Sequence, residues 1–199
     1  QQAPVLFLTA LGATHERLAG FAAGADITGF DAMSEEGAED LLRQGHDVLD
    51  RLEALVEADT WLLPSVGPDA GKMMDQAAVL ADRDFPVALL VPVSPPLTHD
   101  GMGDALRAFY DACGVQLLVY IKTDGYMPAD LLGALVAEGV VFGVKYAVPR
   151  AEGAADPYLD ALIAAIGAER IISGFGEPPA VPHLLDQGLA GFTAGCVCI

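Results

Sequence analysis

Two of the three lysines of the chain stand at the ends of apolar stretches, where an amine can act as a nucleophile. Lys122 follows the apolar run of residues 115–121, and Lys145 lies near the end of the run of residues 140–146. Aliphatic surroundings lower the pKa of a lysine, and a neutral amine forms a Schiff base with a carbonyl substrate. The alternative is a lysine that reaches solvent or pairs with an acid. For Lys145 the first interpretation is favoured, because no carboxylate stands beside it in the sequence.

A phenol stands near the end of the preceding apolar run. Tyr120 can move protons to and from an amine and a substrate hydroxyl, as general acid and base. The alternative is a rim aromatic residue with its hydroxyl in water. Together, Lys145 and Tyr120 predict Schiff-base catalysis, with Lys145 as the nucleophile and Tyr120 as the group that transfers protons.

The elements that position these residues follow a regular pattern of short, continuous apolar runs. The runs cover residues 5–10, 25–30, 60–66, 86–93, 115–121, 140–146, 170–175 and 191–199. Continuous runs are typical of parallel strands that are buried on both faces. Between them lie amphipathic segments with helical periodicity, at residues 70–83, 103–113, 128–138, 158–166 and 177–188. This alternation predicts βαβ units with right-handed crossovers.

Eight candidate strands predict a (β/α)8 TIM barrel, formed by residues 1–199 as a single domain. An open doubly wound sheet is disfavoured, because residues 11–14 lack the glycine fingerprint that follows the first strand of a dinucleotide-binding fold. The length of 199 residues is short for a barrel. We therefore expect segments to be missing in the N-terminal part and after the eighth strand. In such barrels the reactive groups lie at the C-terminal ends of the strands, where Tyr120 and Lys145 stand.

These residues resemble those of the dihydrodipicolinate synthase and N-acetylneuraminate lyase family. The resemblance is carried by Tyr120, by the Gly143-Val144-Lys145 motif about 25 residues later, by Ile172-Ser173-Gly174 and by the stretch of residues 188–193. It implies a (β/α)8 barrel in which Lys145 forms a Schiff base with a 2-oxo acid such as pyruvate or a 2-keto-3-deoxy sugar acid. It also implies that Gly174 and Thr193 position the substrate, that no metal or organic cofactor is needed, and that the chain forms a homo-oligomer, a dimer or tetramer.

The sequence departs from the family pattern at several positions. In place of the usual carboxylate-binding loop it has only Thr28 and Gly29, which we interpret as its remnant; the alternative is an ordinary turn. The arginine of true dihydrodipicolinate synthases is missing from the segment after Tyr120, where Lys122 takes over part of an anion-binding role as a point charge. Their strand-four tyrosine is also absent, at residues 93–94. We therefore expect an aldolase, lyase or dehydratase rather than an enzyme of lysine biosynthesis.

Composition limits the possible partners. The net charge of −18 at pH 7 disfavours nucleic acid and anionic membrane surfaces, and no apolar run is long enough to span a membrane. Three cysteines argue against a disulfide framework and favour a reduced, cytoplasmic protein. His183 is assigned a structural or solvent role within a helical segment. His99 is expected in an exposed loop; the alternative is a substrate-binding or acid–base residue on the catalytic face.

Two other functions remain open from the residues alone. The first is a catalytically decayed barrel that binds a small carboxylate without turnover. The second is a phosphate-binding isomerase barrel, which is disfavoured because Glu177 places an acid where a phosphate would sit.

Overall fold

A computed structural model describes residues 5–8, 49–50, 61–92, 98–151 and 153–193. The chain divides into two compact units, residues 1–66 and residues 67–199. The strand expected at residues 25–30, with Thr28 and Gly29, lies outside the described residues, as do residues 194–199 of the last expected strand. That residues 1–199 form a single domain stays a prediction.

The first unit contains a pair of parallel strands, β1 (Val5–Leu8) and β2 (Trp61–Val66). Val5 is aligned with Trp61, and Leu8 with Pro64. Residues 62–66 are all buried, as expected for a continuous apolar run in a parallel sheet.

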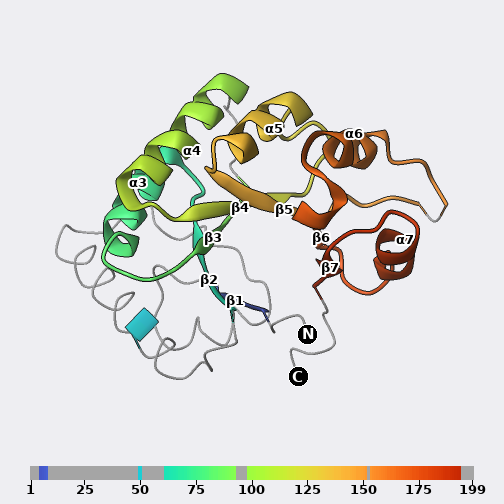
Figure 1. Ribbon diagram of the computed structural model, residues 1–199, viewed down its shortest axis with the longest axis horizontal. Helices are drawn as coiled ribbons and strands as arrows, with labels where there is room; N and C mark the ends of the chain where they lie inside the picture. The colour runs from blue at the N-terminus through green and yellow to red at the C-terminus, as the bar shows by residue number, and fades with distance from the viewer. Residues whose placement is uncertain (1–4, 9–48, 51–60, 93–97, 152, 194–199) are drawn as a thin grey trace, which may run out of the picture. The chain divides into compact units, whose positions relative to one another are not determined.

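In the second unit strands and helices alternate along the chain. They are α3 (Ala70–Leu80), β3 (Val87–Leu90), α4 (His99–Cys113), β4 (Gln116–Ile121), α5 (Ala129–Ala137), β5 (Val141–Tyr146), α6 (Pro157–Ile166), the 3-10 turn η1 (Ala168–Arg170), β6 (Ile171–Ser173), α7 (Ala180–Leu185) and β7 (Gly191–Phe192). Strands β3 to β7 pair in sequence order and are all parallel. Helices α4, α5 and α6 lie along one side of them (Figure 1). The repeating βαβ pattern is that predicted from the sequence; closure into an eight-stranded barrel stays a prediction.

Side-chain caps fix where several helices begin. The Asp69 and Asp156 carboxylates accept hydrogen bonds from backbone amides in the first turns of α3 and α6. Thr98 caps α4 in the same way, so this helix begins at His99 rather than at the predicted residue 103. His99 is therefore an exposed first-turn residue and not a loop residue. Helix α7 is shorter than predicted, because residues 177–179 form a turn that ends in Pro179.

Strands β4 and β5 pair with a one-residue register shift. Leu117 is aligned with Val141, but the next residue, Leu118, is aligned with Gly143, which leaves Phe142 as the extra residue. Extra residues of this kind bend a strand and re-aim the side chains that follow. Regular pairing from Val141 onward would have set Lys145 opposite Ile121; the shift sets it opposite Tyr120.

Arg170 holds the shifted residue in place. Its guanidinium donates a hydrogen bond of 2.9 Å to the carbonyl oxygen of Phe142. The backbone of Arg170 also passes so close to Gly143 that a Cβ there would overlap its carbonyl oxygen. Only glycine allows this approach of two backbones, which gives the glycine of the Gly143-Val144-Lys145 motif a structural reason.

A network of ionic and hydrogen-bonding side chains, buried at Tyr146 and Asp156 and exposed at Asp124, joins the loops after β4 and β5 to the start of α6. The fully buried Tyr146 donates its hydroxyl to the Asp156 carboxylate, with O···O distances of 2.8 and 2.9 Å. Arg150 donates to Asp156 at 2.8 Å and also to Asp124. Burial on its own would raise the pKa of Asp156, but the hydrogen bonds from Arg150, Leu159 and Tyr146 keep it below its usual value. Asp156 therefore stays ionised. Its carboxylate caps α6, accepts the hydrogen bond from Tyr146 and neutralises the Arg150 guanidinium.

We expect Asp156→Ala to lower the free energy of unfolding by about 3 kcal/mol, because it removes a helix cap and leaves Tyr146 and Arg150 without their shared acceptor. Urea denaturation measures this change. The contribution is present above the ordinary aspartate pKa of about 4 and is lost as the pH falls through the lowered value in the folded protein. Asp160→Ala, at an exposed position of the same helix, is the control, with an expected change within about 0.5 kcal/mol. Equal effects of the two substitutions would contradict the role of Asp156.

Candidate active site

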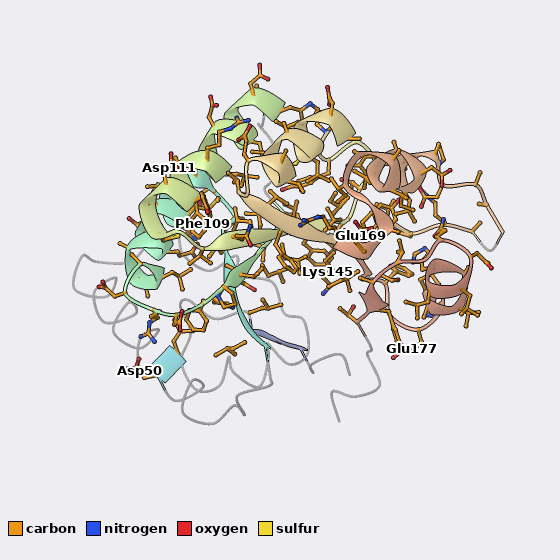
Figure 2. The ribbon with its side chains drawn as sticks, viewed as in Figure 1. Asp50, Phe109, Asp111, Lys145, Glu169 and Glu177 are labelled. Carbon is orange, nitrogen blue, oxygen red and sulfur yellow. The ribbon has the colours of Figure 1, made fainter. Side chains whose placement is uncertain are left out.

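Lys145 and Tyr120 lie side by side at the C-terminal ends of β5 and β4. The two residues are aligned in the sheet, and the Lys145 Nζ atom is 4.5 Å from the centroid of the Tyr120 ring. Because successive residues of a strand point to opposite faces, Lys145 lies on the face away from Tyr146, whose hydroxyl binds the N-cap residue of α6. Figure 2 shows the Lys145 side chain extending from β5. The structure thus brings together the two residues predicted to act in catalysis.

The surroundings of Lys145 favour the neutral amine. Burial lowers the pKa of Lys145, and the nearby ammonium of Lys122 lowers it further. Burial also raises the pKa of Tyr120, so its phenol is protonated at neutral pH and can donate a hydrogen bond. A nucleophilic amine beside a proton donor is the arrangement that carbinolamine formation and dehydration require.

Gly174 follows β6 and packs against the Lys145 side chain. A Cβ at this position would come within 2.7 Å of Lys145 Cγ and 3.1 Å of Lys145 Cε. The Gly174 amide donates to the carbonyl oxygen of Tyr146 at 2.6 Å, so this amide is already engaged within the sheet. The missing side chain at Gly174 leaves the space in which Lys145 lies. A contact between Gly174 and a substrate stays a prediction.

Thr193 follows β7, two strands away from Lys145. Its amide donates to the Ser173 carbonyl oxygen at 2.8 Å, and its hydroxyl lies 3.4 Å from the same oxygen. These bonds fix the end of β7 beside the end of β6. Whether Thr193, Thr28 and Gly29 bind a substrate stays a prediction, and the latter two lie outside the described residues.

The structure shows two groups behind the strand ends whose pairings were not predicted from the sequence. One is the network of Asp124, Arg150 and Asp156, whose members are up to 32 positions apart and carry no recognisable motif. The other is the pair of His183 and the fully buried Ser173, whose Nδ1 and Oγ atoms are 2.8 Å apart. Burial lowers the pKa of His183, which favours the neutral ring. His183 lies on α7 and supports the end of β6 next to Gly174.

Within the ranges that the structure describes, no group of three or more His, Cys, Asp and Glu side chains is arranged to hold a metal ion. None of the helices described there is long and apolar enough to cross a membrane.

We expect Gly174→Ala to destabilise the protein by about 1–3 kcal/mol, because the added methyl group must displace the Lys145 side chain or the strand end. Urea denaturation measures the loss. Gly133→Ala is the matched control: its Cβ would meet Ala165 at an ordinary contact distance of 3.5 Å, within a helix where alanine is favoured. A Gly174→Ala protein as stable as the wild type would show that the lysine is not packed against this glycine.

The reactivity of the Lys145 amine tests its electrostatic surroundings without any substrate. We expect trace acetylation with acetic anhydride, read by peptide mass spectrometry, to reach its half-maximal rate at Lys145 at a lower pH than at an exposed lysine. In Lys122→Gln the midpoint should rise, because a neighbouring positive charge that lowers the pKa of Lys145 is lost. Lys122→Arg keeps the charge and should keep the midpoint. An unchanged midpoint in Lys122→Gln would contradict the coupling of the two amines.

No protein-family model matches the sequence, and no curated protein matches it. Solved structures do match. They include dihydrodipicolinate synthase from Oceanobacillus iheyensis (20% identity, TM-score 0.62, 83% of this chain and 55% of that one) and N-acetylneuraminate lyase from Fusobacterium nucleatum (18% identity, TM-score 0.62, 97% of this chain and 59% of that one). A third is 2-keto 3-deoxygluconate aldolase from Picrophilus torridus (15% identity, TM-score 0.58, 77% of this chain and 55% of that one).

The chain thus spans a little over half the length of each of these proteins. The matched structures include dihydrodipicolinate synthases and N-acetylneuraminate lyases, and the likeness is one of fold: parallel strands that alternate with helices, as the sequence predicted.

Proposed function

We propose that this chain is part of a divergent lyase of this family, of the aldolase or dehydratase type, which acts on a 2-oxo acid through a Schiff base at Lys145. The observation that carries the proposal is the placement of the Lys145 amine, with its lowered pKa, 4.5 Å from the ring centroid of Tyr120 at the ends of two adjacent strands. Pyruvate and 2-keto-3-deoxy sugar acids are the substrates that the resemblance favours. A complete (β/α)8 barrel, a cytoplasmic location and a dimer or tetramer belong to the same proposal.

In the proposed reaction the neutral Lys145 amine attacks the ketone carbon and forms a carbinolamine. Protonation of its hydroxyl by Tyr120 lets water leave, and the C–N bond becomes an iminium. The iminium then accepts the electron pair released when a carbon–carbon bond breaks or when a proton is removed from the adjacent carbon. Protonation of the resulting enamine, at its carbon after cleavage or at the departing hydroxyl in a dehydration, restores an iminium. Addition of a water molecule, which gives a proton to the Tyr120 phenolate, then releases the product and restores the amine.

The remaining predicted site residues have a binding role in this proposal. Thr28 and Gly29 hold the carboxylate of the 2-oxo acid, while Gly174 and Thr193 position the carboxylate and ketone from the neighbouring strand ends. Gly174 also leaves the space in which Lys145 lies.

Borohydride trapping tests the Schiff base directly. The protein is incubated with pyruvate, or separately with a 2-keto-3-deoxy sugar acid, then reduced, and the adduct is located by peptide mass spectrometry. We expect an adduct on Lys145 that is absent in Lys145→Ala and retained in Lys72→Ala, which removes the lysine of α3. A folded wild-type protein without adduct would overturn the mechanism and favour a barrel that binds a carboxylate without turnover.

A further inference from the structure

The loop between β4 and α5 carries Lys122 and is bound at two points by residues that follow β5. The Asp124 carboxylate pairs with the Arg150 guanidinium from the loop after β5. The fully buried Met127 donates its amide to the Tyr158 hydroxyl at 3.1 Å, and its carbonyl oxygen accepts a hydrogen bond of 2.7 Å from the same hydroxyl. The loop after β4 is therefore held by the part of the chain that contains the start of α6.

The two contacts hold the loop in different ways. Arg150 reaches Asp124 from a fixed base, because it also binds Asp156, the N-cap residue of α6. Tyr158 lies in the first turn of the same helix and bonds to the backbone of the loop, so it fixes the chain itself. Burial raises the pKa of Tyr158, and its hydroxyl keeps the proton that it donates while it also accepts.

Lys122 stands on the part of the loop that these contacts restrain. It is exposed, and it directly follows Ile121, whose carbonyl oxygen accepts a hydrogen bond of 2.8 Å from the Ala147 amide. Asp124 follows two residues later. The backbone of Lys122 is therefore held on both sides, although its long side chain is flexible.

The held backbone sets the Lys122 ammonium close to the Lys145 amine. The Nζ atom of Lys122 is 5.5 Å from the centroid of the Tyr120 ring, and that of Lys145 is 4.5 Å from the same point. The two nitrogens are therefore at most 10.0 Å apart. Repulsion between two ammonium groups falls as they separate, so its strength depends on the path of the loop.

We propose that Asp124 and Tyr158 are positioning residues, which hold the loop after β4 so that the Lys122 ammonium stays beside Lys145. Both act through Lys122, whose charge disfavours the protonated form of the nearby amine. The consequence for catalysis rests on the function proposed above, in which the Lys145 amine attacks a ketone. Two side chains outside the catalytic pair thereby contribute to the reactivity of the nucleophile.

The sign of the effect separates positioning from a direct effect of charge. Asp124 is a carboxylate, and the loss of a negative charge near a lysine on its own lowers the pKa of that lysine. Release of the loop has the opposite effect on Lys145, because the repulsion by Lys122 becomes weaker. Tyr158→Phe removes a hydroxyl and no charge, so it reports on the position of the loop alone.

The test measures the pH midpoint of trace acetylation at Lys145 in Tyr158→Phe and in Asp124→Asn. We expect both substitutions to raise the midpoint, by no more than Lys122→Gln raises it. Combined with Lys122→Gln, each should leave the midpoint where Lys122→Gln alone sets it, because the ammonium that they position is gone. A merely structural role would give no such dependence on Lys122.

Two matched controls and a second measurement accompany this test. Tyr110→Phe removes a phenol hydroxyl in the last turn of α4, and Asp130→Asn removes an exposed carboxylate at the start of α5. Neither should raise the midpoint. Amide hydrogen exchange shows whether the loop is released, and we expect faster exchange at Met127 in Tyr158→Phe, because this amide loses its partner.

Each outcome decides for or against the positioning role. Faster exchange of the loop with an unchanged midpoint would overturn it, and so would exchange as slow as in the wild type. A rise that persists in the Lys122→Gln background would overturn it too, because the substitutions would then act by another route. The Schiff base is read separately: the expected shifts in a folded protein that gives no borohydride adduct would overturn the proposed function and leave the positioning role in place.

Discussion

The arrangement of the candidate site depends on the register between β4 and β5 beyond Phe142, where Gly143 is aligned with Leu118 and Lys145 with Tyr120. The register shifts at Phe142, and this shift sets Lys145 opposite Tyr120. The shift is held from the other end of the sheet, where Arg170 binds the Phe142 carbonyl and its backbone lies against Gly143. A contact at the N-terminal end of β6 thus determines which side chain faces the amine at the C-terminal ends of β4 and β5.

The two faces of β5 carry different groups: the candidate catalytic lysine on one, and side chains that bind α6 on the other. On one face, Lys145 lies between the ring of Tyr120 and the backbone of Gly174, where burial favours its neutral form. On the other, the adjacent Tyr146 is buried and bound to Asp156, and its aligned neighbour Ser173 contacts His183. These helix-side contacts tie the ends of β5 and β6 to the start of α6 and to α7.

The strands and the two central residues of the site could be predicted from the sequence, because both depend on local sequence patterns. The apolar runs predicted the strands. Tyr120 and Lys145, at the ends of two successive runs, were predicted as the two central site residues. The register shift could not be predicted, since counting alternate residues from Val141 puts Lys145 on the wrong face; the contact that decides it comes from Arg170. The pairing of Arg150 with Asp124 could not be predicted from the sequence either, because it joins two loops that only the fold brings together. The start of α4 was missed because the cap at Thr98 outweighs a weak apolar pattern in the first turn.

The shift at Phe142 also bears on which changes of chain length the strand can accept. Loss of that one residue would leave Val141 and Gly143 opposite the same partners as before, so the alignment of everything downstream would survive. A single insertion or deletion between Gly143 and Lys145 would shift the alignment of the residues that follow it. It would turn the Lys145 amine toward the helices and the phenol of Tyr146 toward the face of Tyr120. A deletion in this strand is therefore compatible with the pairing of Lys145 and Tyr120 at Phe142, and incompatible with it between Gly143 and Lys145.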